Sequence, residues 1–327
     1  MLTIERNKMK KNSIISASKA TSTKMPATKK RGVNYSALIS RFVDSQDVKP
    51  SSRGNYKRTI RQYFDYIQAR GLSLDNIDRA DLIAYKENLL SHLSPRTVAS
   101  YLVSLRKFYA FAEAEKLYPN IARDLKTPHH GATFVKQHLA EDKIKELLDD
   151  ARKDTPRNFA LINLLLRTGL RTIEAARANV GDLVTIEGRQ VLKVWGKGRD
   201  SADAFVIVSD KAFAPLKAYL DARHAHQGEP LFTSDSRRNG GGRLTTRTIS
   251  AICKEHLVNI GLDSHEYTAH SLRHTTAVEI LKSGGTTEDA QFVLRHSSPA
   301  TTQIYTQSIK QEIRLKKAVE CKLDDLF

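Results

Sequence analysis

The sequence predicts a mainly α-helical protein with a small antiparallel β-sheet, divided into two domains. The chain has 327 residues, which suggests roughly two domains at about 150 residues each. Apolar residues recur at spacings of three and four over most of its length, as they do in amphipathic helices. Three short β-rich runs separated by glycines stand together in the second half, where they indicate an antiparallel sheet.

The first segment, residues 1–32, differs in composition from the rest of the chain. It contains nine Lys and Arg against one acidic residue, and so holds almost half of the formal net charge of +17. It is rich in Ser, Thr, Ala and Lys and lacks helical periodicity, which predicts a disordered basic arm. Contact with a DNA backbone and a merely solubilising role are both compatible with such an arm.

Residues 33–125 are expected to form a helical bundle. Asp78 with Asp81 predicts a capped helix start, and Ser94 before Pro95 predicts another. The expected helices cover 35–46, 51–70, 78–91 and a segment from 94 to about 112. Seven basic residues lie on the polar faces of these helices, where they form either a solvated surface or a nucleic-acid contact: Arg53, Lys57, Arg58, Arg61, Arg96, Arg106 and Lys107.

A linker over 126–135, marked by proline, glycine and two adjacent histidines, is expected to precede a mixed domain over 136–327. Its strands are expected at 183–187, 191–195 and 204–208. Its helices are expected at 141–152, 156–167, 210–224, 245–260, 270–283, 287–295 and 308–324.

Composition also excludes several classes of protein. No apolar run approaches the roughly 18 residues of a membrane-spanning helix, and residues 1–28 are basic and polar, without the apolar region of a secretory signal. We therefore expect a cytoplasmic protein with no membrane partner. The two cysteines, Cys253 and Cys321, exclude a disulfide framework and a four-cysteine zinc site. His270 and His274 lack further ligands at metal-binding spacing, so no metal or cofactor is expected. The net charge and pI near 9.8 favour nucleic acid as partner.

Six side chains of the second domain have the types that suit nucleophilic attack on a phosphodiester: Arg171, Lys197, His270, Arg273, His296 and Tyr305. The phosphate gains negative charge in the transition state, and preorganised guanidinium groups stabilise that charge with paired hydrogen bonds. A tyrosine phenol needs roughly 4 kcal/mol to ionise at pH 7 unless a base or a positive field assists it. His270 is a candidate base, and Lys197 could protonate the leaving oxygen.

The order of these six residues, and four segments that carry all of them but Lys197, resemble the tyrosine recombinase family, which includes phage-type integrases and Xer-like recombinases. The four segments are TGLRTIE (168–174), HSLRHTTA (270–277), LRHSS (294–298) and TTQIY (301–305). The resemblance covers residues 33–327 and implies a SAM-like core-binding domain followed by a catalytic domain.

By this resemblance, Tyr305 forms a 3′-phosphotyrosyl link. Arg171, Arg273 and His296 hold the phosphate, Lys197 is the general acid, and His270 is its acid–base partner. Glu174 matches an acidic position that supports the site. One residue departs from the family pattern: Arg295 stands where glycine is usual, and we expect it to add charge near the DNA.

The family further implies a homo-tetramer on double-stranded DNA, built by docking of the final helix into a neighbouring protomer, with docking in cis as the alternative. We favour integration or excision of a mobile element, where accessory DNA-bending proteins can take part. Xer-like resolution of chromosome or plasmid dimers is the second interpretation. A non-catalytic DNA-binding regulator and a type IB topoisomerase are further alternatives.

Overall fold

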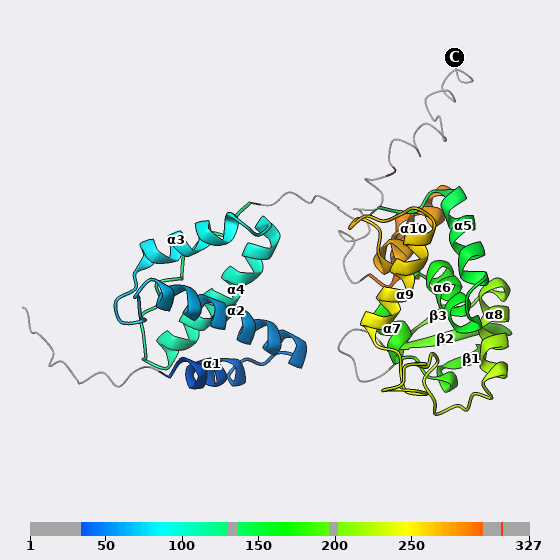
Figure 1. Cartoon of the computed structure of the whole chain (residues 1–327), viewed down its shortest axis with the longest axis horizontal. Helices are drawn as coiled ribbons and strands as arrows, with labels where there is room; N and C mark the ends of the chain where they lie inside the picture. Colours follow the sequence, from blue (N-terminus) through cyan, green and yellow to red (C-terminus); the bar gives the residue numbers. More distant parts are fainter. Residues whose placement is uncertain (1–33, 130–136, 196–201, 297–308, 310–327) are drawn as a thin grey trace, which may run out of the picture. The chain divides into compact units, whose positions relative to one another are not determined.

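The computed structural model describes residues 34–129, 137–195, 202–296 and 309. These residues fall into two compact units, with the boundary between Pro128 and His129 (Figure 1). The expected basic arm, most of the expected linker and most of the expected final helix lie outside the described residues. So do Lys197 and Tyr305.

In its described residues, 34–128, the first unit has four helices: α1 (Tyr35–Asp44), α2 (Pro50–Ala69), α3 (Arg79–Leu90) and α4 (Pro95–Ala114). The Asp78 side chain caps α3 by accepting from the Asp81 backbone, while the Asp81 carboxylate accepts from the Asp78 backbone. Phe42 and Phe64 both meet Phe108 edge to face, at centroid distances of 5.6 and 5.3 Å. This aromatic core fixes α1, α2 and α4 together.

The second unit combines helices with one sheet. Its helices are α5 (Glu141–Arg152), α6 (Pro156–Thr168), α7 (Thr172–Arg177), η1 (Val180–Asp182), α8 (Asp210–Ala222), α9 (Thr246–Asn259), α10 (Ala269–Lys282) and α11 (Thr287–Leu294). Its strands are β1 (Leu183–Ile186), β2 (Arg189–Trp195) and β3 (Ala202–Ile207). The strands pair antiparallel in the order β1-β2-β3.

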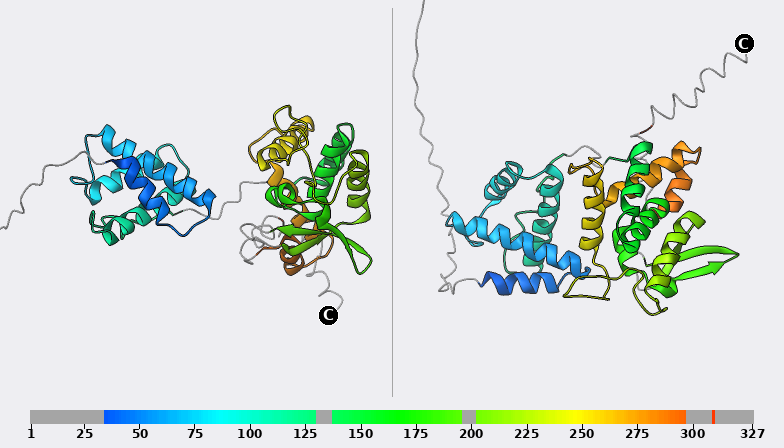
Figure 2. Two further views of the ribbon diagram at one scale, coloured as in Figure 1. Left: turned by 90° about the horizontal axis from the view of Figure 1, so that it is seen from below. Right: turned by 45° about the vertical axis from the view of Figure 1, so that its right-hand side comes forward.

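The sheet has one buried and one open face. Leu192, Val194 and Val206 are buried, whereas Phe205 and Ile207 are 51% and 53% exposed. Figure 2 shows the sheet projecting from the side of the helical layer. An apolar groove of about 860 Å³ runs between β3 and α11, and Phe205, Ile207 and Phe292 contribute to its lining.

Helix α6 forms the centre of the second unit, because it packs against α5, α8 and α10. Its residues 160–166 are buried on nearly every side. Thr155 caps its start by accepting from the Asn158 backbone, and Gly169 ends it in the left-handed conformation. The C-terminal end of α6 is therefore fixed in the interior, and the candidate site is built beside it.

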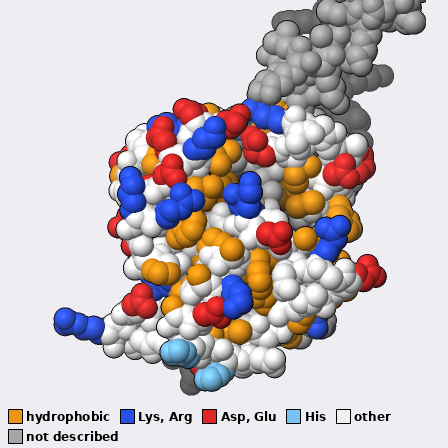
Figure 3. Space-filling model, turned by 90° about the vertical axis from the view of Figure 1, so that its right-hand side faces the viewer, with side chains coloured by type: hydrophobic (Ala, Val, Ile, Leu, Met, Phe, Trp, Pro, Cys, Tyr) orange, Lys and Arg blue, Asp and Glu red, His pale blue; other side chains and the backbone are white. Residues whose placement is uncertain are grey.

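The surface of the molecule mixes charged and apolar groups. On the face shown in Figure 3, apolar side chains lie in recesses between Lys, Arg, Asp and Glu side chains. Among the described helices, none combines the length and the apolar character that crossing a bilayer requires.

The expected fold class is confirmed, and most expected elements agree with the structure to within a few residues. Helix α5 has the bounds that the sequence predicts. Strand β2 starts two residues earlier than expected, because Glu187 and Gly188 (φ 48° and 75°) form a tight turn directly before Arg189. Helices α7 and η1 were not expected at all.

Candidate active site

Arg171 lies at the turn between α6 and α7, and Glu174 fixes it there. The backbone N–H of Arg171 donates to Glu174 Oε2 at 2.8 Å, and Arg171 Nη1 donates to Glu174 Oε1 at 2.7 Å. The Glu174 side chain is buried, whereas that of Arg171 is 32% exposed. The carboxylate therefore holds the arginine from the protein side and leaves part of its guanidinium open to solvent.

Gly169 permits this turn for two reasons. Its φ of 60° lies in the left-handed region, where a side chain is disfavoured. A Cβ placed on Gly169 would also lie 2.5 Å from Leu294 Cδ2. The close approach of Gly169 to Leu294 brings the C-terminal ends of α6 and α11 together.

Arg273 joins these two helix ends. It lies on α10, is 1% exposed, and donates from Nη1 to the carbonyl oxygen of Gly169 and from Nη2 to that of Leu294. Carbonyl groups at helix C-termini carry partial negative charge, so they stabilise a buried guanidinium. The position of Arg273 thus depends on α6, α10 and α11 at once.

His270 lies on the first turn of α10, which Thr268 caps by accepting from the His270 backbone N–H at 3.3 Å. Its side chain is exposed. His270, Arg171 and Arg273 line one small cavity of about 140 Å³, together with hydroxyl-bearing residues. The hydroxyl-bearing lining residues are Thr172, Ser250 and Thr268. Two guanidinium groups, an imidazole and several hydroxyls therefore converge on a single polar space.

His296 follows the end of α11 and is largely buried. Its backbone N–H donates to the Gln291 carbonyl at 3.1 Å, and Gln291 Nε2 donates to the His296 carbonyl at 3.3 Å. Burial, followed by the positive charges of Arg273 and Arg171, lowers the pKa of His296 to about 4. The imidazole is therefore neutral at pH 7 and can offer an N–H group without adding a charge.

Arg295 occupies an inward position that the sequence did not predict. It ends α11 with φ 54° and ψ 48°, and its side chain is 13% exposed. Arg295 Nη2 donates to Glu174 Oε2 at 2.8 Å. Burial alone would raise the pKa of the Glu174 carboxyl, but the Arg295 charge and the hydrogen bonds from Arg171 outweigh it and lower that pKa. The Arg295 side chain therefore pairs with a buried carboxylate that also binds Arg171.

The structure brings four of the six expected reacting residues into one region. Arg171, His270 and Arg273 line the cavity, and their charges reach His296. Lys197 and Tyr305 lie outside the described residues. Arg295 was recognised in the sequence only as a departure from a pattern, and its contact with Glu174 has no signal in the spacing. Among the described residues, no cluster of three or more His, Cys, Asp or Glu could hold a metal ion.

Comparison with known proteins identifies the family of the chain. Residues 137–312 match the phage integrase family, and residues 44–116 match its N-terminal SAM-like domain. Tyrosine recombinase XerD from Xanthomonas axonopodis pv. citri is 30% identical over 297 residues, which cover 85% of this chain and 95% of that protein. Tyrosine recombinase XerC from Actinobacillus pleuropneumoniae serotype 7 is 30% identical over 257 residues, covering 77% and 81%.

Solved structures share the fold. XerH recombinase bound to a palindromic difH substrate superposes with a TM-score of 0.68 at 21% identity, over 87% of this chain and 84% of that one. A lambda integrase dimer bound to a COC′ core site superposes with a TM-score of 0.64 at 17% identity, over 82% of this chain and 94% of that one. The family match and the similarity to XerD and XerC place the chain among the tyrosine-type, site-specific DNA recombinases. The chain belongs to the phage integrase family.

Proposed function

We propose that this recombinase cuts and rejoins DNA strands through a covalent link between Tyr305 and a 3′-phosphate. The observation that carries the proposal is the small cavity lined by Arg171, His270 and Arg273. Its two guanidinium groups are positioned by other parts of the protein before any phosphate enters. Preorganised cationic donors of this kind stabilise the charge that develops on a phosphodiester during attack.

The donors around the cavity have distinct roles. Arg171 and Arg273 contact the non-bridging oxygens and supply permanent positive charge, because a guanidinium stays protonated. The low pKa of His296 makes it a neutral N–H donor to the same phosphate. Glu174 orients Arg171 without reaching the substrate, since its carboxylate is fully engaged by Arg171 and Arg295.

The reaction balances without an external energy source. The Tyr305 phenol oxygen forms a bond to phosphorus while the bond from phosphorus to the 5′ oxygen breaks. His270 accepts the phenolic proton, and Lys197 donates a proton to the leaving 5′ oxygen. Attack of a 5′-hydroxyl on the phosphotyrosine reverses each step, so that a new strand is joined and Tyr305 is released.

Described residues on both sides of Tyr305 belong to the second unit. His296 precedes it by nine positions at the site. Ile309 follows it by four and is buried beside Val278 and Leu281 of α10. The chain thus leaves the site at His296 and returns to the same unit at Ile309, which supports attack by Tyr305 on a phosphate in the cavity.

The partner of the enzyme is double-stranded DNA, and the active assembly is a tetramer in this proposal. The solved structures of lambda integrase include a tetramer bound to a Holliday junction, which supports the assembly through the shared fold. The apolar groove between β3 and α11 offers Phe205, Ile207 and Phe292 to a partner. Ile309 is buried in its own unit, so the occupant is the rest of the apolar segment, residues 310–324, of a neighbouring protomer, with docking in cis as the alternative.

Two biological roles fit this chemistry. Integration or excision of a mobile element is supported by the basic arm over 1–32, which exceeds what dimer resolution requires. Dimer resolution is supported by the similarity to XerD, of which 95% is covered. Sequencing the DNA junctions formed in cells that express the protein separates the two, because excised circles and resolved replicon dimers leave different products.

A nicked suicide substrate tests the chemistry. Wild-type protein should trap a covalent protein–DNA adduct in the presence of EDTA, and Tyr305→Phe should trap none while binding the same DNA. An adduct formed by Tyr305→Phe would show that another residue is the nucleophile. Binding by the wild type with no adduct on any cognate site would favour a non-catalytic regulator.

A further inference from the structure

Arg295 stands at a backbone position that favours glycine. Its φ of 54° and ψ of 48° place it in the left-handed region, which ends many helices and which L-residues with long side chains adopt at a cost. A compensating interaction of the side chain is therefore expected. His224, at φ 51° after α8, shares this backbone state but has an exposed side chain.

The Arg295 side chain is held on two sides in the interior. Nη2 donates to Glu174 Oε2 at 2.8 Å, and Nη1 donates to the Val293 carbonyl at 2.6 Å. The Glu174 side chain is only 1% exposed. A charge-assisted hydrogen bond this well shielded from solvent fixes both partners more firmly than a surface ion pair does.

Glu174 and Arg295 together determine how Arg171 is held. Arg171 Nη1 donates to Glu174 Oε1 at 2.7 Å, and Arg171 Nη2 approaches the Arg295 carbonyl oxygen at 3.4 Å. The two terminal nitrogens of the Arg171 guanidinium are thus oriented by two different groups. Arg295 acts on both nitrogens: its carbonyl oxygen accepts from Nη2, and its side chain binds the Glu174 carboxylate that accepts from Nη1.

Arg295 also changes the charge of the cluster. A carboxylate paired with Arg171 alone would cancel most of the positive charge that Arg171 presents to a phosphate. Shared between two guanidinium groups, Glu174 leaves the trio of Arg171, Glu174 and Arg295 with a net charge of +1. The field of this trio then favours an anion in the adjacent cavity.

We infer that Arg295 is a positioning residue of this recombinase: it holds Glu174, and through Glu174 it sets the orientation and net charge of Arg171 toward the scissile phosphate. The inference rests on the proposed function, because it assigns Arg171 to that phosphate. If Arg295 only ended α11, glycine would replace it with a gain in stability and no loss of activity, since glycine adopts the same backbone freely. The two roles therefore predict opposite results for one substitution.

The test compares Arg295→Gly, Arg295→Met and Arg295→Lys in single-turnover cleavage of nicked DNA, with affinity measured separately. The glycine and methionine variants should cleave about 10–100-fold more slowly, the scale of effect that a small misplacement of a reacting group produces. Their Kd for DNA should change little, and Arg295→Lys should recover part of the rate. His224→Gly is the matched control and should cleave like the wild type. Wild-type cleavage by Arg295→Gly would overturn the inference.

A second measurement does not depend on cleavage, so it separates this inference from the proposed function. The pKa of His296, followed by NMR, should rise in Arg295→Met because a nearby positive charge is removed. Unfolding of Glu174→Gln, Arg295→Met and the double variant should show coupling between the two positions. No rise and no coupling would overturn the inference even in an active enzyme. If the pKa of His296 rises and the two positions are coupled, but the protein forms no adduct with DNA, the contact between Arg295 and Glu174 is retained and the proposed function is rejected.

Discussion

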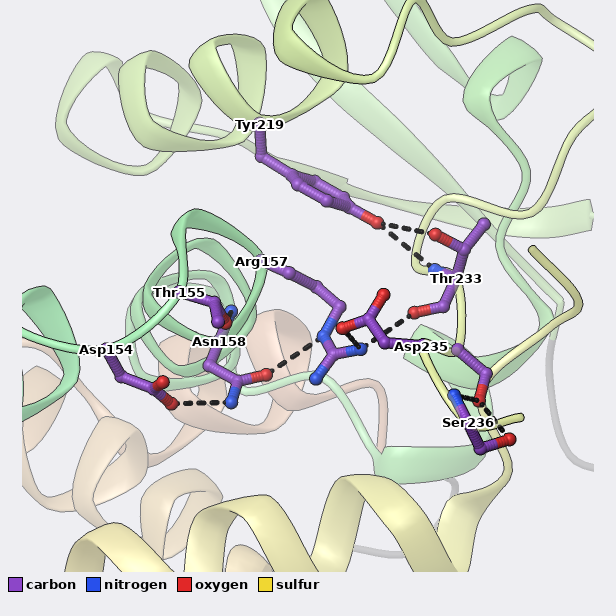
Figure 4. Close-up of polar contacts among 9 residues, drawn as sticks. Asp154, Thr155, Arg157, Asn158, Tyr219, Thr233, Asp235 and Ser236 are labelled. Carbon is purple, nitrogen blue, oxygen red and sulfur yellow. Dashed lines mark hydrogen bonds and ion pairs between the residues drawn. The ribbon is translucent and has the colours of Figure 1, made fainter. Parts of the chain in front are cut away.

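Two polar networks built around arginine lie in the second unit, and their charges are balanced differently. The first, here called the Arg157 network, joins the start of α6 to the loop after Leu231, as Figure 4 shows, and continues through His256 to α5 and α9. Arg157 Nη1 donates to Asp235 Oδ2 at 2.5 Å and its Nε donates to Asn158 Oδ1 at 3.0 Å. Asn158 Nδ2 in turn donates to Asp154 at 2.6 Å. His256 then lies between Asp154 and a further carboxylate, that of Asp150.

The second, here called the site cluster, consists of Arg171, Glu174, Arg273 and Arg295. The Glu174 carboxylate pairs with both Arg171 and Arg295. Arg273 donates instead to the carbonyl oxygens of Gly169 and Leu294. In the Arg157 network, by contrast, three carboxylates face one arginine and one histidine. A network that neutralises its cations fastens segments together, whereas a cluster left positive beside a cavity is suited to bind an anion.

The site cluster and the Arg157 network should differ most in their response to the loss of one arginine, the first in cleavage rate and the second in stability. Arg273→Ala should lower the cleavage rate by about 10³-fold or more, because it removes a preorganised donor to the phosphate. Arg157→Ala should lower the free energy of unfolding by about 1–3 kcal/mol, since it removes a hydrogen-bond donor from the buried Asn158 side chain, with little effect on the rate of the folded enzyme. Single-turnover cleavage and chemical denaturation measure the two effects. Equal losses of rate in both variants would remove the distinction.

Gly169→Ala should damage the site cluster through the backbone. The added Cβ would meet Leu294 at 2.5 Å, and φ would stay at 60°. We expect a loss of about 2 kcal/mol or more in the free energy of unfolding, with slower cleavage, because the carbonyl that accepts from Arg273 is displaced. Gly188→Ala is a control with positive φ but open space around its Cβ position, so it should reduce stability without a matching loss of cleavage rate.

The two regions should lose stability in different pH ranges as the solution is acidified. The pKa of His296 is lowered from 6.5 to about 4 in the folded chain. Between these two pH values the imidazole is protonated in the unfolded chain but stays neutral in the folded one. Stability should therefore fall by about 1–3 kcal/mol between pH 6.5 and 4, and His296→Gln should flatten this range.

In the Arg157 network, burial opposes ionisation of Asp150 and Asp154. Hydrogen bonds from His256, Asn158 and Asn259 outweigh it and lower the pKa of both carboxyls. The stability they contribute is present above about pH 4 and is lost as the pH falls below that value. Asp154→Asn should therefore change the stability profile only at the acid end. A change between pH 6.5 and 4 in Asp154→Asn, and not in His296→Gln, would reverse the assignment.

The smallest effect is expected at the apolar groove. Phe292 is 80% exposed, so Phe292→Ser should change the free energy of unfolding by less than about 0.5 kcal/mol. It should nevertheless reduce tetramer formation on paired DNA sites by several-fold, because the groove loses an apolar contact for the segment over 310–324. Size-exclusion chromatography of the DNA complexes measures this. Unchanged assembly would indicate that the segment docks elsewhere.

The sequence predicted those parts of the fold that local signals specify. Helix α5 was predicted with its correct ends, because an acidic first turn and a strong apolar stripe mark it. Helix α7 was missed because six residues are too few to show a period, and Glu174, which ties its first turn to Arg171, reads locally as an ordinary surface acid.

The candidate site could be predicted as a set of residue types but not as a geometry. The motif order suggested that Arg171 and Arg273 act together, yet their proximity depends on Gly169 meeting Leu294 across three helices. Arg295 was expected to add charge near the DNA, but nothing in the sequence indicated the partner that its side chain pairs with. Its inward turn depends on a buried Glu174 that is 121 positions away.

The position of the scissile phosphate tests the central claim most directly. A structure of Tyr305→Phe bound to intact cognate DNA should place that phosphate in the cavity between Arg171 and Arg273. Its non-bridging oxygens should lie about 2.7–3.1 Å from both guanidinium groups, the range of such donors, with the residue 305 ring directed at phosphorus. A phosphate bound away from this cavity, with no DNA contact at Arg171 or Arg273, would contradict the account.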